Sequence, residues 1–202
     1  MSNNKDFKVK NGIKPTAYQE TLGTVVSGSE SYNFSSFAYD NSSLVLTGRN
    51  LNDLALSSDG TRIYYIDNNG YIRQRSLSTA YDLSTAGSET YFDQDAQDSD
   101  PRAVTFKTDG TKMYFTGDQT NSVYQYSLST AWDVTTASYD NKSFNTTIHA
   151  PYSTQFKSDG TKMYITGASA IYEYSLSTAW DVSTVSYTSN SFNFTSQDSM
   201  ME

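Results

Sequence analysis

The sequence contains no cysteine, and it has one histidine and three prolines among its 202 residues. Without cysteine, the fold depends on no disulfide bond. His149 has no second histidine and no cysteine to join it in a metal site or a catalytic triad, so we interpret it as a loop residue. There is also no long apolar run, so we expect neither a secretory signal nor insertion into a membrane. We predict no catalytic residue, no metal and no cofactor, and hence a protein that is not an enzyme.

Basic side chains are scarce as well, with 14 Lys and Arg against 22 Asp and Glu and a net charge of −8. Four lysines lie within residues 1–14, and these are Lys5, Lys8, Lys10 and Lys14. The acidic remainder argues against binding to nucleic acid, which requires clustered lysine and arginine. We therefore predict that residues 1–30 form an arm whose four lysines dock on an acidic surface of another protein. A solvated tail is the alternative.

A period of about fifty residues runs through the rest of the chain. Asp-Gly pairs recur at 59–60, 109–110 and 159–160. The strings KTDGTKMYFTG and KSDGTKMYITG, which begin at Lys107 and Lys157, differ at two positions. A second motif follows in each unit as RSLSTAYDL or YSLSTAWDV, from Arg75, Tyr126 and Tyr174. Such repetition in register is typical of repeat proteins.

Each unit is predicted to form four short strands, because Asp-Gly favours a tight hairpin and the composition is rich in Ser, Thr, Asn and Tyr. We assign repeats to residues 51–100, 101–150 and 151–202, and the last strand of a preceding unit to residues 31–50. In the second strand, Tyr64, Tyr114 and Tyr164 lie opposite a second apolar face, so sheets should cover both sides. The predicted fold class is all-β, with β-propeller-like blade repeats in an incomplete or open array and an N-terminal arm. A β-sandwich is the main alternative.

Aromatic residues in the third strand and the following loop are the main candidates for packing between blades or for contact with a ligand. They are Tyr81, Trp132, Trp180, Tyr124, Tyr126, Tyr172 and Tyr174. Stacking of sugar rings on the two tryptophans is one interpretation, but their recurrence in register favours packing. In the first unit, Arg73 and Arg75 replace the strand tyrosines, which suggests the polar face of a terminal repeat. We expect the third unit to expose Tyr172 and Tyr174 unless something covers them.

The stretch DQDAQDSD, which contains Asp93, Asp95, Asp98 and Asp100, offers oxygens of the kind that Ca²⁺ prefers. It lacks the glycine and the final glutamate of an EF-hand loop. We interpret it as a solvated loop, which is the usual role of a cluster of charges.

The strings DGTKMY and VYQYSLSTAWDVTTASYD resemble a blade-like repeat of virion structural proteins from tailed phages, marine ones especially, and of some bacterial surface proteins. The opening NKDFKVKNGI is similar to the N-termini of phage tail-fibre proteins. The resemblance implies a virion component located in the phage tail, and most simply a tail fibre that contributes to host attachment. It further implies docking on other virion proteins, such as a tail adaptor or a nozzle-like protein, assembly as a homotrimer, and contact with a host surface glycan or protein.

Two alternatives stay open on the residues alone. One is a glycan- or protein-binding propeller module of a bacterial surface adhesin, and the other is a propeller enzyme, for which no converging set of carboxylates is evident. Three complete units are fewer than the four to eight blades of closed propellers. We therefore expect that the chain does not close by itself. Either it continues beyond the given sequence or copies of it cover each other's ends, with three-fold packing preferred.

Overall fold

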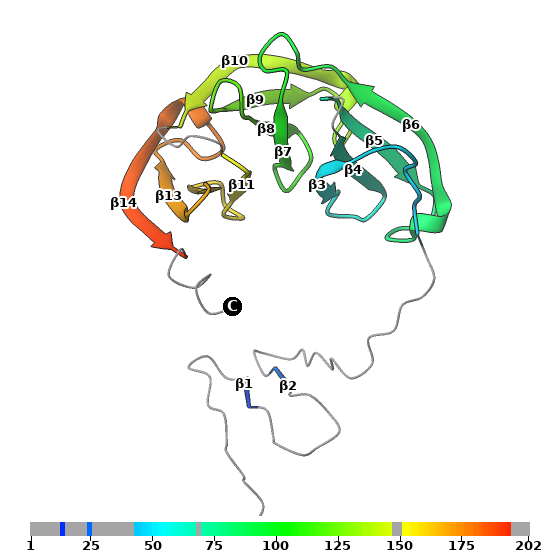
Figure 1. Ribbon diagram of the computed structural model, residues 1–202, viewed down its shortest axis with the longest axis horizontal. Coiled ribbons are helices and arrows are strands. Elements are labelled where there is room, and N and C mark those ends of the chain that lie inside the picture. The colour runs from blue at the N-terminus through cyan, green and yellow to red at the C-terminus, as the bar shows by residue number, and fades with distance from the viewer. Residues whose placement is uncertain (1–12, 15–23, 26–42, 68–69, 147–150, 195–202) are drawn as a thin grey trace, which may run out of the picture. The chain divides into compact units, whose positions relative to one another are not determined.

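The computed structural model describes residues 13–14, 24–25, 43–67, 70–146 and 151–194. The chain divides into two units, residues 1–42 and residues 43–202. In the first unit, β1 (Ile13–Lys14) pairs antiparallel with β2 (Thr24–Val25). The second unit contains the other described strands, β3 to β14 (Figure 1).

These strands form three antiparallel sheets of four, each with its strands in chain order, which we call blades 1, 2 and 3. Blade 1 consists of β3 (Leu51–Leu56), β4 (Arg62–Asp67), β5 (Ile72–Leu77) and β6 (Ala86–Phe92). Blade 2 consists of β7 (Pro101–Phe106), β8 (Lys112–Gly117), β9 (Ser122–Leu128) and β10 (Ala137–Asn145). Blade 3 consists of β11 (Ser153–Phe156), β12 (Lys162–Thr166), β13 (Ala170–Leu176) and β14 (Val185–Asn193).

The Asp-Gly turn joins the first two strands of every blade. In blade 1, the Asp59 carboxylate accepts hydrogen bonds from the Ser57 hydroxyl and from the backbone N–H and hydroxyl of Thr61. These bonds lower the pKa of Asp59 to about 2. Gly60 has φ +70°, in the left-handed region that glycine adopts without steric cost. The recurring Asp-Gly pair therefore marks a turn that both residues stabilise.

A short 3-10 turn precedes the outer strand of each blade. These turns are η2 (Leu83–Thr85), η3 (Val134–Thr136) and η4 (Val182–Thr184). Each begins at an aspartate whose side chain accepts the backbone N–H two residues later, and these aspartates are Asp82, Asp133 and Asp181. The Ser-Thr-Ala-aromatic-Asp motif thus ends each third strand and directs the chain back along the outer edge.

The three blades lie side by side as an open arc within the second unit, with β3, β7 and β11 innermost and β6, β10 and β14 outermost (Figure 1). One hydrophobic core cluster fills the boundary between blades 1 and 2, with Tyr64 and Ile72 from one side and Met113 and Tyr126 from the other. A second cluster fills the boundary between blades 2 and 3, where Tyr114 meets Met163 and Tyr174. The core therefore lies between the sheets, as expected for stacked propeller blades.

The prediction that both faces of the second strand are covered is confirmed in blade 2, where Met113, Tyr114 and Phe115 are all buried. In blade 3, Met163 and Ile165 are buried while Tyr164 remains partly exposed. Tyr164 differs because its side of the sheet has no following blade among the described residues.

Each sheet lies within one of the predicted repeats of residues 51–100, 101–150 and 151–202. The predicted last strand of a preceding unit, residues 31–50, is different. Its described part, residues 43–50, forms no strand, and residues 31–42 lie outside the described residues. No helix in the described ranges is long and apolar enough to cross a membrane.

Candidate interaction surfaces

Each boundary between blades repeats the same tyrosine contact. The Tyr64 hydroxyl donates a hydrogen bond to the backbone carbonyl of Trp132 at 2.5 Å, and the Tyr114 hydroxyl donates to that of Trp180 at 2.7 Å. The Tyr64 ring also packs on Phe106, with 4.3 Å between centroids. A tyrosine on one blade therefore contacts both an aromatic ring and a loop carbonyl on the next blade.

A buried glutamine makes a second repeated contact. The Gln74 side-chain carbonyl accepts the Val134 backbone N–H at 2.9 Å, and Gln125 accepts the Val182 N–H at 3.0 Å. Both glutamines are almost fully buried. They satisfy the first N–H of the 3-10 turn in the next blade, which would otherwise be buried without a partner. We did not single out these glutamines from the sequence, although they occupy the same place in the third strand.

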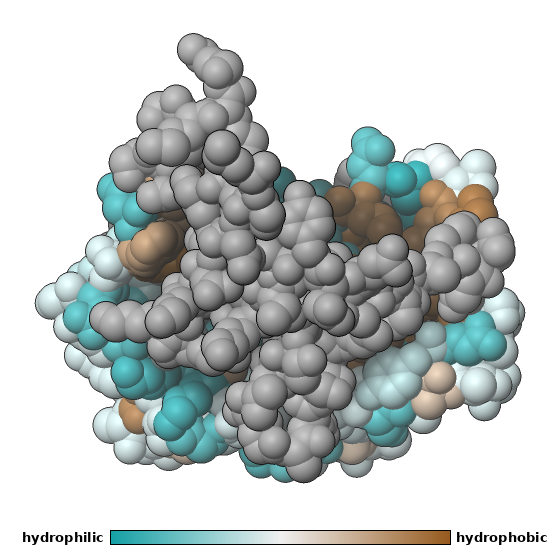
Figure 2. Space-filling model, turned by 90° about the horizontal axis from the view of Figure 1, so that it is seen from below, coloured by the Kyte–Doolittle hydropathy of each residue, from teal (hydrophilic) through white to brown (hydrophobic). Residues whose placement is uncertain are grey.

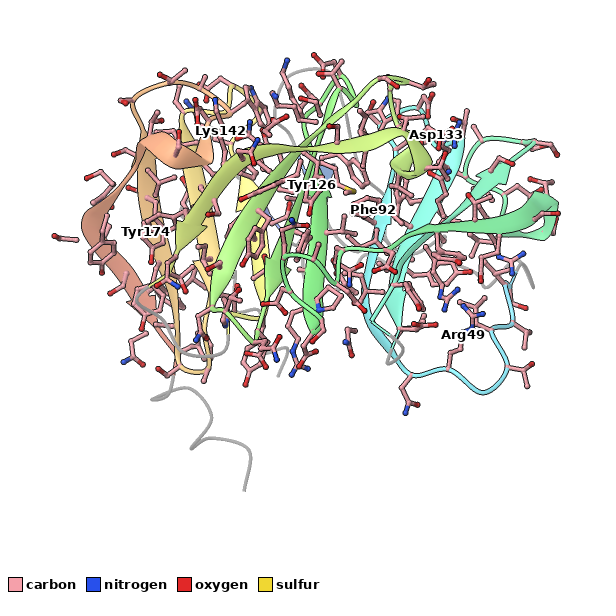
Figure 3. All side chains as sticks on the ribbon, turned by 90° about the horizontal axis from the view of Figure 1, so that it is seen from above. Arg49, Phe92, Tyr126, Asp133, Lys142 and Tyr174 are labelled. Atoms are coloured by element: carbon pink, nitrogen blue, oxygen red, sulfur yellow. The ribbon has the colours of Figure 1, made fainter. Side chains whose placement is uncertain are left out.

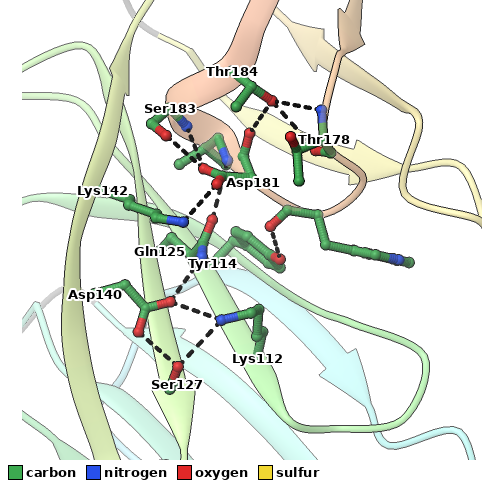
Figure 4. Close-up of polar contacts among 12 residues, drawn as sticks. Lys112, Tyr114, Gln125, Ser127, Asp140, Lys142, Thr178, Asp181, Ser183 and Thr184 are labelled. Atoms are coloured by element: carbon green, nitrogen blue, oxygen red, sulfur yellow. Dashed lines mark hydrogen bonds and ion pairs between the residues drawn. The ribbon is translucent and has the colours of Figure 1, made fainter.

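Ion pairs flank the glutamine at the boundary between blades 2 and 3 (Figure 4). Lys142 of β10 bridges to Asp181 of blade 3 at 2.5 Å, and Lys112 pairs with Asp140 at 2.9 Å within blade 2. Burial alone would raise the pKa of Asp140, but hydrogen bonds from Ser127, Lys112 and Gln125 outweigh it and hold this pKa below its usual value. At this boundary, paired charges therefore surround an apolar centre.

The predicted tyrosines of the third strand face the preceding blade. Tyr126 meets Phe92 of blade 1 edge-on at 5.1 Å, and the two side chains point toward one another in Figure 3. Tyr174 meets Phe144 of blade 2 in the same way at 5.2 Å. Tyr124 stacks on Phe115 within blade 2 and donates to the Gln97 carbonyl.

The expectation that Tyr174 would be exposed in blade 3 is wrong, because its exposed fraction is 2%. Tyr172, by contrast, is partly exposed and lies near Tyr187, with 6.2 Å between ring centroids. The third-strand tyrosines lie on the side that blade 2 covers. The uncovered aromatic surface of blade 3 lies on its opposite side.

The aromatic residues of the Ala-Trp-Asp loops cover the Asp-Gly turns of their own blades. A Cβ atom added at Gly110 would lie 2.4 Å from the Trp132 ring, and one at Gly160 would lie 2.3 Å from that of Trp180. Tyr81 covers Gly60 in the same way and donates from its hydroxyl to the Ser58 carbonyl at 2.8 Å. In the two tryptophans, the face turned to the glycine is unavailable for a sugar ring.

The arginines of blade 1 form a charged end face. Arg73 pairs with the buried Asp67 at 2.8 Å and with Glu89 at 2.8 Å, and Arg49 pairs with the same two carboxylates at 3.1 and 3.0 Å. Arg75 donates to the hydroxyl of the buried Tyr65 at 3.1 Å. In blades 2 and 3, the equivalent side of the sheet is covered by the preceding blade, through Phe92 and Phe144. In blade 1, ion-paired arginine side chains cover it instead, as the replacement of tyrosine by arginine suggested.

The side of blade 3 that faces away from blade 2, which we call the last face, is apolar rather than charged. A hollow of about 310 Å³ lies on it, lined by Tyr164, Ile171, Glu173, Asn190, Ser191 and Phe192. Phe192 is 61% exposed and Ile171 is 37% exposed. Glu173 pairs with Lys162 at 3.0 Å at the edge of this hollow. This is an apolar surface with a polar rim, of the kind that marks protein interfaces.

A groove of about 330 Å³ lies along the inner strands β3 and β7, and Leu54, Leu56, Phe106 and Trp132 contribute to its lining. Leu54 and Leu56 are 59% and 43% exposed. In the view from below, brown hydrophobic surface is recessed between teal polar edges on this side (Figure 2). The groove is a second surface that a partner or ligand can contact.

The acidic loop is only partly solvated, contrary to the sequence-based interpretation. Asp93 and Asp95 are exposed, but Asp98 is buried. Asp98 accepts hydrogen bonds from the backbone N–H and the hydroxyl of Thr120, at 2.8 and 2.6 Å. Its carboxylate therefore ties the loop before β7 to the turn between β8 and β9.

Other predicted residues lie elsewhere. Lys14 belongs to β1, whereas Lys5, Lys8, Lys10 and His149 lie outside the described residues. Within the described ranges, no group of three or more histidines, aspartates and glutamates is placed to hold a metal ion.

The fold has clear structural relatives, whereas no protein-family model and no curated protein matches this sequence. The β-propeller domain of Cps50 (Swd1) from Myceliophteria thermophila is 9% identical, with a TM-score of 0.51 over 74% of this chain and 46% of that one. A structure of the nidogen–laminin complex is 15% identical, with a TM-score of 0.53 over 78% of this chain and 51% of that one. A candidate 6-phosphogluconolactonase of Bacteroides uniformis is 10% identical, with a TM-score of 0.53 over 90% and 51%.

The chain folds as β-propeller blades. At these identities the similarity concerns the fold alone, and it carries over no ligand or reaction. In these three comparisons the chain spans about half the length of the structures that it matches.

Proposed function

We propose that this protein is a structural component of a phage virion, most simply a tail fibre or its virion-proximal part, in which the blades serve as a protein-contact module. The observation that carries the proposal is the last face of blade 3, where an exposed phenylalanine and isoleucine surround a hollow with a charged rim. Such a surface fits a protein partner. The resemblance of the repeat and of the opening segment to phage virion proteins supports the location in the tail.

In this proposal, residues 1–30 dock on a tail adaptor or nozzle-like protein, the protein works as a homo-oligomer, and the distal part contributes to host attachment. The uneven charge supports the docking step, because Lys5, Lys8, Lys10 and Lys14 precede a body with a large excess of acidic residues. Lysines concentrated in a short segment favour an acidic socket on a neighbouring protein.

Deletion of residues 1–14 tests the docking step. In a phage that encodes this protein, the truncated chain should be absent from purified particles, as judged by mass spectrometry, while circular dichroism of the isolated protein still shows folded blades. Changing Lys5, Lys8 and Lys10 to Gln should lower incorporation too. A matched variant, Lys157→Gln, alters an exposed lysine of blade 3 and should leave incorporation unchanged. Normal incorporation of the truncated chain would contradict the proposal.

We further propose that the protein catalyses no reaction. The aspartates that recur in register have structural partners: Asp59 binds its own turn, and Asp133 caps η3 while accepting a hydrogen bond from Gln74. Screening on ester, glycoside and phosphate substrates tests this, since turnover that depends on one Asp or Glu would overturn it.

A second candidate function is glycan binding by an adhesin-like module, which the groove along β3 and β7 favours because aromatic and aliphatic side chains line it beside polar ones. A glycan array probed with the purified protein distinguishes the two, because specific binding that is lost in Leu54→Asp would favour the adhesin.

A further inference from the structure

The two end faces of the blade array carry the two halves of the contact that joins the blades internally. On the last face, Tyr164 occupies the position of Tyr64 and Tyr114, whose hydroxyls donate to the carbonyls of Trp132 and Trp180 in the next blade. On the first face, which is the side of blade 1 that faces away from blade 2, Tyr81 occupies the position of those tryptophans. The donor and the acceptor of a third copy of this contact are thus present at opposite ends of one chain.

The apolar parts of the contact match in the same way. Phe106 of blade 2 packs on Tyr64, and Phe156 of blade 3 packs on Tyr114, at centroid distances of 4.3 and 4.5 Å. In blade 1 the equivalent residue is Leu56, which is 43% exposed. Leu56 is therefore an uncovered apolar side chain at the place where an internal blade meets a tyrosine of its neighbour.

The turn that the buried glutamines recognise is also uncovered in blade 1. Val134 and Val182, whose N–H groups bind Gln74 and Gln125, have no exposed surface, whereas the equivalent Leu83 is partly exposed. On the last face, Glu173 replaces the glutamine. Its carboxylate oxygens accept hydrogen bonds as a glutamine carbonyl does, so Glu173 can bind the Leu83 N–H of another copy.

The charges on the two faces are complementary. Arg62 of blade 1 lies 3.7 Å from Asp133, which caps the turn of the next blade. The equivalent pair across the two ends is Lys162, whose side chain is 41% exposed, and Asp82. Phe192 occupies the position of Phe92, which meets Tyr126, and it would meet Arg75 instead. An arginine over an aromatic ring is a favourable pair.

We propose that the last face of blade 3 binds the first face of blade 1 of a second copy of this chain, so that two copies close a ring of six blades. Each copy of three blades uses both ends, and the same contact is then made twice. Three copies in such a ring would give nine blades, outside the range of about four to eight in closed propellers.

Mass measurement tests the proposal. By analytical ultracentrifugation or native mass spectrometry, the purified chain should have twice its mass of 22.5 kDa, and electron microscopy should show closed rings. Phe192→Asp, which alters the last face, and Leu56→Asp, which alters the first, should each give folded monomers. Equal mixing of the two variants should restore dimers, because one intact face of each kind remains and forms a single contact.

The controls separate a lost contact from a lost fold. Tyr152→Ser removes an aromatic side chain that is 49% exposed and lies on neither end face, and it should leave the mass unchanged. Lys162→Glu reverses the charge of a partly exposed side chain that pairs with Glu173, and it should weaken the dimer while the circular dichroism spectrum is retained. A monomer or a trimer of the unaltered chain, a dimer that withstands both Asp variants, or mixed variants that stay monomeric would overturn the proposal.

This inference rests on the proposed function, because it names a second copy of the chain as the partner of the last face and gives the homo-oligomer two copies in place of the three expected from the sequence. A monomer would leave the docking role of residues 1–14 untouched, and normal incorporation of the truncated chain would leave the ring untouched.

Discussion

The two ends of the blade array come from copies of one repeat and yet differ in polarity. On the first face, Arg73 and Arg75 satisfy their charges on Asp67 and Glu89 within the same blade. On the last face, Ile171 and Phe192 are exposed around a hollow. At the first end, side chains of blade 1 itself therefore cover much of the sheet. At the last end, apolar side chains that are buried in an internal blade remain exposed. Substitutions at equivalent positions can measure this difference.

The largest effect is expected at the tyrosine of the second strand. Tyr114→Ala removes a buried ring that packs on Phe156 and donates to the Trp180 carbonyl, and it should lower the free energy of unfolding by about 4 kcal/mol. Tyr164→Ala, at the equivalent place on the partly exposed last face, should cost only about 1 kcal/mol in dilute protein. Urea denaturation followed by circular dichroism measures both values. Equal losses would show that something already covers the last face.

The charged end should depend strongly on one arginine. Arg73→Met leaves Asp67, whose side chain is fully buried, with less compensation for its charge, and should destabilise the fold by about 3 kcal/mol. Lys107→Met breaks an exposed pair with Asp109 and should change stability by at most about 0.5 kcal/mol. The same denaturation experiment compares them. If Arg73→Met were as mild as Lys107→Met, the first face would not be held by its ion pairs.

The buried amide offers a smaller contrast. Gln125→Met removes the acceptor of the Val182 N–H and should cost about 2 kcal/mol, because that N–H then stays buried without a partner. Glu173→Met, at the same position on the last face, should change the stability of the dilute chain by about 0.5 kcal/mol. A loss at Glu173 as large as that at Gln125 would contradict the open state of this face.

High pH should destabilise the packing between the blades, because buried tyrosines must then ionise. Burial raises the pKa of the hydroxyls of Tyr64, Tyr114 and Tyr126 above their ordinary value of 10.0. The folded state therefore favours their neutral form, so the stability that they contribute is complete below pH 10 and is lost as the pH rises above it. Absorbance of tyrosinate at increasing pH should show a late group of tyrosines that ionise together with the loss of the circular dichroism signal. Ionisation of all tyrosines in one early step without unfolding would contradict this.

Much of the fold could be predicted because its signals are local and repeated. The Asp-Gly pairs recur wherever a turn needs a glycine with positive φ, as at Gly60 and Gly110. The alternation around Tyr114 indicated a strand covered on both faces, and the structure confirms it. The sequence did not show which side of the third strand packs against the preceding blade. For this reason Tyr174 was expected to be exposed, although Phe144 covers it. The burial of Asp98 was missed for a similar reason, since its partner Thr120 lies 22 residues away.

The sequence by itself determined the repeat, the four strands of each unit, the turn that joins the first two strands and the polar substitution in the first unit. These follow from alternation, from glycine and from register, all of which act over a few residues. Only the tertiary structure decided which side of each sheet meets which neighbour, because the order of blades along the arc sets that choice. It placed Arg73 beside Asp67 and paired Gln125 with the Val182 N–H of the next blade, and it left Tyr164 and Phe192 on a surface without a following blade among the described residues. The physical reason is that a strand has two equivalent faces, and only packing against other strands makes them different.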